Sequence, residues 1–416
     1  MSTRREFLRR TAAAGAVVAA SSIRSIDADA AGTEMLQSKV LRLAIVGTGE
    51  LSERYLTQGT VSQRARFVAA CSQPQESTKK LAIQNGIDAW FDDYHKMYDT
   101  VKPDAIIVAT PIDVEPMLAA FERGIHVLCD KPMARTWEEC RTVVETAERN
   151  RVTYLCQPFT ADPTLRAALD YLNEDMLGTF VGAEAQSFIP GVARGGWYYD
   201  RKLGGGATFN SLVYSVSRLI DMLGPARRVA GFVNTLIPHR ILGDGYIVHE
   251  APPPRDAHNH RTVESAADDN VSLVLEWPSG QQAVVRSMWA TSLILGGDTV
   301  IYGRHGTLWL SGENLVLHSP ERAIADAEPV TWNGHKDCYR VPVKVSETDV
   351  RIEHFVDCIL GLSQPVCGGR QRLHAHEILF KGFETQRTGR TQTLETTFVL
   401  QHRLDPAFLD TRSHYI

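Results

Sequence analysis

The spacing of hydrophobic residues along the chain changes at about residue 160. Before that point, short apolar or β-branched runs alternate with segments of helical spacing. Strands inside a parallel sheet are covered on both faces, so they are apolar almost throughout. The runs that predict such strands are residues 40–46, 66–71, 104–109, 125–129 and 153–156. This alternation predicts a doubly wound parallel sheet with helices on both faces.

Helix-end signals lie between these predicted strands. Pro116 is placed to start one helix and Gly124 to end it, as is typical of helix termini. Thr136 and Glu139 have the spacing of a capping box, and residues 137–147 then continue with helical spacing.

Beyond residue 160 the pattern has a period of two. Residues 271–277 and 282–289 alternate apolar and polar side chains, with the turn sequence Pro278-Ser279-Gly280 between them. This indicates an antiparallel hairpin. Residues 238–265, which contain three consecutive prolines, have the composition of a long surface loop. The second half therefore predicts an α+β domain with a large, open, mostly antiparallel sheet.

A glycine motif follows the first predicted strand and opens a helix. Gly47-x-Gly49-x-x-Ser52 has the spacing and context of a dinucleotide-binding fingerprint. Gly47 permits the tight turn, Gly49 lets the backbone approach a pyrophosphate, and Ser52 is small enough to keep helix and strand close. We expect Gly47, Thr48, Gly49 and Ser52 to contact the cofactor, and the first domain to be a Rossmann domain.

The end of the second predicted strand bears on which dinucleotide is bound. An acidic residue there would hold the ribose diol of NAD, whereas Ser72 lacks the charge that would repel a 2′-phosphate. Lys79 and Lys80 downstream favour NADP, although they fit a solvated helix face equally well. The expected cofactor is NADP or NAD, and we expect Ser72 to be one of the residues that contact it.

With 416 residues, the chain exceeds what one hydrophobic core usually serves. We expect a signal peptide at 1–30, a dinucleotide-binding Rossmann domain at 31–160 and a substrate-binding α+β domain at 161–416. An apolar outer face on an open sheet would pair with a second copy, so we expect a homo-oligomer formed through the C-terminal sheet.

Composition limits the partners. The chain has 44% hydrophobic and 22% charged residues and a net charge of −5, which is ordinary for a soluble enzyme. No basic patch is present, which argues against nucleic acid as a partner. The longest apolar run, residues 12–20, is too short to span a bilayer, so we expect no membrane helix.

The first thirty residues have the order of a twin-arginine signal. Arg4 and Arg5 precede the apolar run, and Ala28-Asp29-Ala30 supplies a small-residue cleavage pattern. We expect the twin-arginine export machinery to carry the folded protein to the periplasm or outside the cell. A protein exported in the folded state can take a tightly bound nucleotide with it.

Cysteine and histidine patterns indicate neither disulfides nor a metal. The seven cysteines are odd in number and form no Cys-x-x-Cys pair, so we expect free, buried thiols. His249, His258 and His260 lack a further ligand at a recognisable spacing, and we expect no metal site. His374 and His376 stand two apart in a predicted helix, which favours a structural role or one behind the residues that meet the substrate.

Three further motifs carry a resemblance to a known family. They are the run at 107–111, which ends in Thr110-Pro111, the triplet Asp130-Lys131-Pro132 after a predicted strand, and the glycine run at 204–207. With them the chain resembles the Gfo/Idh/MocA oxidoreductases over residues 40–395, and in particular the glucose–fructose oxidoreductase branch. The resemblance implies cofactor contacts at Thr110, Pro111, Asp130 and Lys131, with the lysine at the nicotinamide edge.

The chain departs from this family at two positions of the implied catalytic site. Asn210 and Tyr214 stand where family members commonly have Asp and His, the histidine being the usual general base. Tyr214 can replace it, as a tyrosine does in the glucose–fructose oxidoreductase branch, if Lys131 makes the phenol acidic enough. We expect Lys131 and Tyr214 to handle the hydroxyl proton and Asn210 to orient a substrate hydroxyl.

These features predict an NAD(P)-dependent oxidoreductase that acts on a carbohydrate or polyol. Glu115 and residues 157–159 replace basic residues of the family, which favours a neutral substrate, and residues 197–201 offer aromatic faces to a sugar ring. Two alternatives stay open. One is a redox-neutral glycosidase or epimerase that uses the same bound cofactor. The other is a sugar-binding or sensory homologue without catalysis.

Overall fold

The computed structural model describes residues 39–110, 113–158, 163–173, 176–192, 196–243, 246–248, 260–291, 295–312, 314–321, 323–324, 327–343 and 351–400. The predicted export signal at 1–30 lies outside the described residues, as do Pro111, His249 and His258.

The first domain is built on a parallel sheet, and the predicted fold class is confirmed. Among the described residues, six strands pair in the order β3-β2-β1-β4-β5-β6, all parallel. The strands are β1 (Leu41–Val46), β2 (Ala65–Cys71), β3 (Trp90–Phe91), β4 (Ala105–Val108), β5 (His126–Cys129) and β6 (Tyr154–Cys156). Five match predicted runs. β3 was not predicted, because two residues carry no periodic signal.

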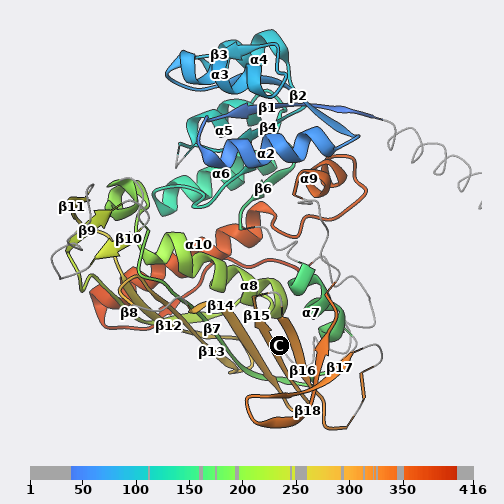
Figure 1. Cartoon of the computed structure of the whole chain (residues 1–416), viewed down its shortest axis with the longest axis vertical. Coiled ribbons are helices and arrows are strands. Elements are labelled where there is room, and N and C mark those ends of the chain that lie inside the picture. The colour runs from blue at the N-terminus through green and yellow to red at the C-terminus, as the bar shows by residue number, and fades with distance from the viewer. Residues whose placement is uncertain are drawn as a thin grey trace, which may run out of the picture.

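Helices cover both faces of this sheet, as Figure 1 shows. They are α2 (Glu50–Val61), α3 (Gln75–Gln84), α4 (Tyr94–Val101), α5 (Glu115–Phe121) and α6 (Trp137–Arg149). The predicted capping box is confirmed: the Thr136 hydroxyl accepts from the Glu139 backbone N–H, and the Glu139 carboxylate accepts from that of Thr136. Gly124, with φ of 70°, follows the end of α5.

The second domain contains a mixed sheet. In the described part of the chain, ten strands pair in the order β17-β18-β16-β15-β14-β7-β13-β12-β8-β19, all antiparallel except β7 with β13. Its strands are β7 (Phe180–Phe188), β8 (Arg228–Asn234), β12 (Asn270–Glu276), β13 (Gln282–Met288), β14 (Leu295–Gly303), β15 (Thr307–Ser311), β16 (Asn314–His318), β17 (Glu328–Trp332), β18 (His335–Val341) and β19 (Gln392–Thr393). The predicted hairpin, β12 with β13, is confirmed.

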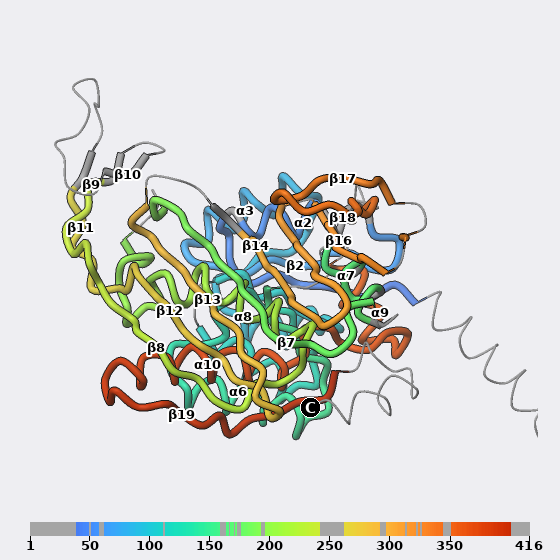
Figure 2. The backbone as a smooth tube through the Cα atoms, turned by 90° about the horizontal axis from the view of Figure 1, so that it is seen from below, coloured from blue at the N-terminus to red at the C-terminus, as the bar shows by residue number. Residues whose placement is uncertain are grey.

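Helices lie on the face of this sheet that is turned towards the first domain (Figure 1). They are α7 (Pro163–Asn173), α8 (Val213–Leu223) and α10 (Gly369–Thr388), with the short turns η1 (Gly196–Tyr199), η2 (Arg201–Leu203) and η3 (Thr208–Leu212). In β12, Val271, Leu273 and Leu275 face the helices and are fully buried, whereas Val274 on the other face is 38% exposed. Figure 2 views the molecule from that outer side, where strands cross in front of the helices.

The expected long loop at 238–265 was wrong in part. A small sheet forms there from β9 (His239–Gly243), β10 (Tyr246–Val248) and β11 (His260–Glu264), with β9 in the centre. The strands are short, three to five residues, and none of them shows a long alternation of apolar and polar residues, so the sequence pattern did not predict them. The three prolines lie in the connection between β10 and β11 and not in either strand.

One late segment returns to the first domain. In α9 (Arg351–Ile359), Phe355 and Val356 are fully buried against the core that contains β1 and α2. Arg64 pairs with Asp357 and with Glu353, each at 2.6 Å. The segment therefore packs with residues almost 300 positions earlier, and the predicted domain boundaries stay a prediction.

Two further findings concern the chain as a whole. All seven cysteines lie in described residues and are free thiols, six of them buried, which confirms that expectation. Within the described ranges, no helix combines the length and apolar character needed to cross a membrane.

Candidate active site

The glycine turn after β1 has the geometry that a dinucleotide needs. Gly47 adopts φ of 115° and donates its N–H to the Cys71 carbonyl oxygen at 2.8 Å. A Cβ added at Gly47 would lie 2.9 Å from the carbonyl carbon of Ala109. A larger residue is therefore excluded by both conformation and space.

Gly49 leaves room for a ligand. It is exposed, and a Cβ added there would meet no atom within 4 Å. Helix α2 begins at the next residue, so its N-terminus is open to an anion. The hydroxyls of Ser52 and Thr110 are buried and have no hydrogen-bond partner among the described residues. These unpartnered groups and the open glycine fit a bound dinucleotide.

The end of β2, where the cofactor ribose is expected, carries hydroxyl groups. The Thr48 hydroxyl donates to Ser72 Oγ at 3.4 Å. Lys79 holds its ammonium 6.0 Å from the centre of the Trp90 ring, as part of α3. A neutral Ser72 is compatible with either NAD or NADP.

Lys131 joins the two halves of the molecule. It follows β5, and its Nζ lies 3.4 Å from Asn210 Oδ1 and 3.5 Å from the Asn210 carbonyl oxygen. The same Nζ lies 5.3 Å from the centre of the Tyr214 ring. The structure thus brings together Lys131, Asn210 and Tyr214, the three predicted catalytic residues, from segments about eighty positions apart.

Burial shifts the ionisation of Lys131 and of its neighbour Asp130. Removal from water lowers the pKa of Lys131, and the Asp130 charge opposes this only in part. Burial likewise raises the pKa of Asp130. Asp130 accepts from the Lys131 backbone N–H at 2.8 Å and from the Tyr55 hydroxyl at 3.4 Å. An ammonium with a lowered pKa can exchange a proton nearer to neutral pH.

The pKa of the Tyr214 phenol shifts in the direction opposite to the one expected: it is raised instead of lowered. The side chain lines a cleft and is 47% exposed, yet burial, followed by the Asp130 charge, raises its pKa. The expected lowering by Lys131 is absent, and the ammonium lies against the ring, where a cation is attracted by the π face. Tyr214 therefore keeps its proton at neutral pH and can act as a hydrogen-bond donor.

The Asn210 side chain hydrogen-bonds to the glycine run that precedes it. Its amide nitrogen donates to the carbonyl oxygens of Gly204 and Gly206, at 3.2 and 3.0 Å, while its Oδ1 faces Lys131. In this arrangement the amide orients the lysine. The expected contact with a substrate hydroxyl stays a prediction.

A pocket opens beside these residues. It has a volume of about 270 Å³ and is lined by Ser187, Asn210, Ser211, Tyr214, Ser215, Arg218 and Gly297. Asn210, Tyr214 and Arg218 follow one another at intervals of four, so they lie on one side of the η3–α8 segment. Sequence reasoning missed Arg218, although this spacing from Tyr214 was visible. Ser187, on a distant strand, gave no signal.

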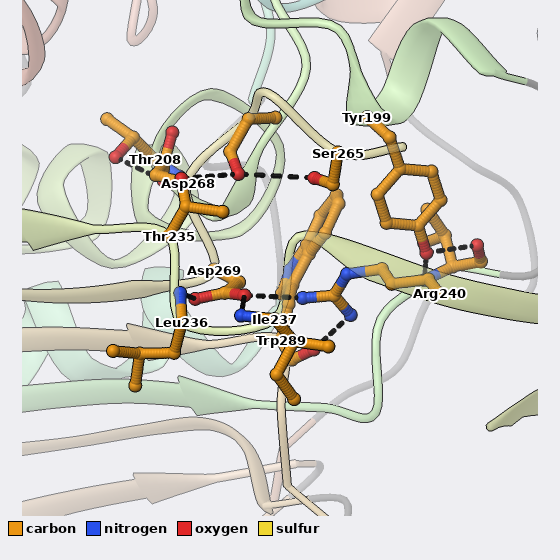
Figure 3. Close-up of polar contacts among 12 residues, drawn as sticks. Tyr199, Thr208, Thr235, Leu236, Ile237, Arg240, Ser265, Asp268, Asp269 and Trp289 are labelled. Carbon is orange, nitrogen blue, oxygen red and sulfur yellow. Dashed lines mark hydrogen bonds and ion pairs between the residues drawn. The ribbon is translucent and has the colours of Figure 1, made fainter. Parts of the chain in front are cut away.

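A buried network supports the helix that carries Asn210 (Figure 3). Asp268 accepts from the backbone N–H and the hydroxyl of Thr208, both at 2.8 Å. Next to it, Asp269 pairs with the fully buried Arg240 of β9 at 2.7 Å. Trp289 Nε1 donates to Ser211 Oγ at 2.7 Å. The start of η3 is thus held in place by the chain around residue 268.

The aromatic cluster at 197–201 divides into two parts. The rings of Trp197 and Tyr198 stack with centroids 3.8 Å apart, and both side chains are half-buried. Tyr199 is buried and donates its hydroxyl to the Val192 carbonyl oxygen at 2.6 Å. Tyr199 is therefore structural, whereas Trp197 and Tyr198 stay partly accessible.

The remaining predicted positions are structural or fall outside the description. His374 and His376 hydrogen-bond to backbone groups of neighbouring segments, which agrees with a supporting role. Within the described ranges, no group of three or more His, Cys, Asp and Glu side chains could hold a metal. Gln157 is buried, whereas Phe159 lies outside the described residues.

Comparisons with known proteins agree with this architecture. Residues 41–157 match the model described as an oxidoreductase family with an NAD-binding Rossmann fold, and residues 165–309 match the GFO/IDH/MocA C-terminal domain. The chain is 29% identical over 303 residues to a D-glucoside 3-dehydrogenase of Escherichia coli K12, covering 70% of this chain and 74% of that protein. It is 24% identical over 368 residues to a D-apiose dehydrogenase of Paraburkholderia graminis, covering 85% and 89%.

Among solved structures, levoglucosan dehydrogenase in complex with NADH is similar with a TM-score of 0.72 and 16% identity, covering 86% of this chain and 100% of that one. At this identity the likeness shows the fold.

Proposed function

We propose, on the premise that this chain belongs to the Gfo/Idh/MocA oxidoreductase family, that it moves a hydride between a tightly bound NAD(P) and the hydroxyl-bearing carbon of a carbohydrate or polyol. The observation that carries the proposal is the meeting of Lys131, Asn210 and Tyr214 near the end of β5, beside a pocket that Asn210 and Tyr214 line.

The nucleotide would be held by the glycine turn and the strand ends next to it. Gly47, Thr48, Gly49 and Ser52 would bind the pyrophosphate at the N-terminus of α2, and Ser72 would contact the adenosine ribose. Thr110 has an unpartnered hydroxyl that suits the same ligand. Asp130 and Lys131 would lie at the nicotinamide end. Pro111, outside the described residues, is proposed from its place in the sequence.

Lys131 would accept the hydroxyl proton as the substrate alcohol becomes a carbonyl. The nicotinamide, when bound, supplies the acceptor for the hydride. Burial lowers the pKa of Lys131, which makes the neutral amine accessible at a lower pH than for an exposed lysine. Tyr214, whose pKa is raised, would donate a hydrogen bond to the substrate oxygen, and Asn210 would hold the lysine in position.

The proposed substrate class rests on the pocket and on the relatives. A volume of about 270 Å³ lined by hydroxyl, amide, phenol and guanidinium groups suits a monosaccharide unit with several hydroxyls. Two similar proteins are named for their action on a D-glucoside and on D-apiose. The stacked pair Trp197 and Tyr198 would offer an aromatic face to the ring of such a substrate.

The decisive experiment is a panel of sugars, glycosides and polyols mixed with the purified protein and NAD or NADP. Growth of the absorbance band of the reduced nicotinamide with at least one of them is expected. Release of an aglycone or inversion of a centre without net reduction would support the redox-neutral alternative. If no compound reduces the nucleotide and none is transformed, the enzymatic proposal fails in favour of a sugar-binding role.

If the protein is exported, its nucleotide cannot exchange with the nucleotides of the cytoplasm. We propose that Arg4 and Arg5 direct the folded chain through the twin-arginine route, with its nucleotide inside. The exported protein should then purify with bound nucleotide, and Arg4→Lys with Arg5→Lys should keep it in the cytoplasm. Cell fractionation together with the absorbance of the purified protein tests this. Protein that is found in the cytoplasm or free of nucleotide contradicts it.

We further propose that two copies associate through the outer face of the large sheet. Phe232 is 68% exposed there, and Val274 and Val284 are 38% and 39% exposed. An apolar sheet face of this kind is typical of a subunit interface. Light scattering should report an oligomer, and Phe232→Lys should shift it towards the monomer. A wild-type monomer at micromolar concentration overturns the proposal.

A further inference from the structure

Helix α10 lies between the two domains and contacts helices of both (Figure 1). It packs against α6 of the first domain and against α8 of the second. Two of its turns bear buried polar side chains, which are costly to bury unless they are hydrogen-bonded.

The contact on the side of the first domain is made by His376. This side chain is fully buried, and its Nε2 accepts from the backbone N–H of Met133 at 2.9 Å. Met133 is the second residue after Lys131. On the other edge of the ring, His376 Nδ1 donates to the Arg372 carbonyl oxygen at 2.8 Å. Both backbone partners have fixed roles, so they select the neutral tautomer that carries its proton on Nδ1.

Burial keeps the imidazole in this neutral form. It lowers the pKa of His376 to about 4, so the Nε2 lone pair is available to Met133 throughout the neutral range.

The contact on the side of the second domain is made one turn earlier. Gln371 and Arg372 both donate to the Asp221 carboxylate near the end of α8. The two charged groups are almost completely buried. Since α8 continues directly from η3, it carries Tyr214 two turns before Asp221.

We propose that His376 is a positioning residue, which holds the turn containing Lys131 against α10 and so sets the ammonium at its distance from Asn210 and Tyr214. α10 then serves as the common support of both sides of the site. This inference rests on the proposed function of Lys131. The direct contacts of Lys131 are long, 3.4 Å and 3.5 Å, and they do not fix its position alone.

His374 provides a matched control on the same helix. It is also fully buried, and burial lowers its pKa to about 4 as well. Its Nε2 accepts from the backbone N–H of Ala226 at 3.0 Å, and its Nδ1 contacts the Thr396 hydroxyl at 2.9 Å. Both partners belong to the second domain and lie away from the turn containing Lys131. A purely structural role predicts equal effects for the two histidines.

The test compares full-length His376→Leu, His376→Gln and His374→Leu after loading with nucleotide. Both leucine variants should lower Tm. Only His376→Leu should also lower kcat for the best sugar, by about 10-fold or more, and move the pH–rate limb that Lys131 sets. His376→Gln, whose amide oxygen can accept from the Met133 N–H, should recover most of kcat and most of the wild-type position of the pH–rate limb. His374→Leu should keep kcat within about twofold, since it leaves the reacting geometry in place.

A second readout separates this inference from the proposed function. Lysines are methylated with a carbon-13 label, the Lys131 signal is assigned with Lys131→Arg, and its titration is followed by NMR without any substrate. The Lys131 pKa should move in His376→Leu and stay in place in His374→Leu. Equal behaviour of the two variants in titration and in kcat overturns the positioning role. Absence of sugar oxidation by the wild type alone would overturn only the proposed function.

Discussion

Lys131 contacts the ring of Tyr214, and the protein shifts the pKa values of the two groups in opposite directions. Burial lowers the pKa of the ammonium and raises that of the phenol, because in each case it favours the uncharged form. Paired groups whose pKa values are driven in opposite directions are a common way to assign the proton acceptor and the donor of an enzyme. In this pair, the direction of the two shifts supports the proposal that Lys131 is the proton acceptor for alcohol oxidation.

Replacement of Lys131 by Met tests that assignment. The rate of alcohol oxidation in the wild type should rise with pH through the pKa of Lys131, since the neutral amine is the base. Lys131→Met should lower kcat by about 10²–10⁴-fold and remove this limb from the pH–rate profile. Tyr214→Phe should lower kcat and keep the limb. A limb that survives in Lys131→Met and vanishes in Tyr214→Phe would make the phenol the base after all.

The two glycines of the turn after β1 should respond differently to alanine. At Gly47, φ of 115° and the contact with Ala109 predict a loss of about 1–3 kcal/mol in the free energy of unfolding. At Gly49 no atom lies within 4 Å of the added methyl, so the fold should keep its Tm, and nucleotide should bind at least about tenfold more weakly because the methyl stands in the path of the pyrophosphate. Thermal melts and nucleotide titration distinguish the two. Unchanged nucleotide affinity in Gly49→Ala would count against the placement of the pyrophosphate.

At the scale of elements, helix α6 is defined by its first turn. The Thr136 hydroxyl and the Glu139 carboxylate satisfy each other's backbone N–H groups, so the helix begins at Trp137. This reciprocal pattern depends on four neighbouring residues. It is therefore readable in the sequence without knowledge of the fold.

Thr136→Ala should lower the free energy of unfolding by about 1 kcal/mol, because one N–H of the first turn loses its acceptor. Thr142→Ala is the matched control, since Thr142 is exposed in the middle of the same helix and donates only to the Glu138 carbonyl oxygen. The control should be neutral or slightly stabilising, as alanine favours helix. Urea denaturation measures both, and equal losses would mean that the cap contributes nothing.

At the scale of the whole molecule, α10 carries two buried histidines, of which His376 contacts the first domain and His374 the second. His374 and His376 have pKa values lowered to about 4, whereas an unfolded histidine titrates near ~6.5. Between these values the unfolded chain binds more protons than the folded one. The free energy of unfolding should therefore fall as pH falls from about 6.5 towards about 4.

Asp268, with a pKa raised to about 6, works in the opposite direction over part of this range, because the folded state then holds the extra proton. The informative quantity is the difference in slope between the wild type and His374→Gln/His376→Gln, in which the Asp268 contribution cancels. The double variant should show a flatter decline between pH 7 and pH 5, measured by urea denaturation at each pH. Parallel curves would show that the two histidines titrate alike in both states.

Much of the fold was readable from local pattern. The strands of the first domain, the capped helix, the hairpin of β12 with β13 and the glycine turn each depend on residues within a few positions of one another, where backbone sterics and neighbouring hydrogen bonds set the conformation. The pairing of Lys131 with Asn210 and Tyr214 came from resemblance to a family, and the distances between them agree with it.

Other features arise only when distant segments meet. The raised pKa of Tyr214, the presence of Ser187 and Arg218 in one pocket, the return of α9 to the first domain and the support of the Lys131 turn by His376 join residues tens to hundreds of positions apart. Desolvation and side-chain contact depend on which surfaces are buried together. No periodicity along the chain encodes that, so the fold class and the cofactor motif belong to the sequence, whereas the proton chemistry and the substrate pocket belong to the folded molecule.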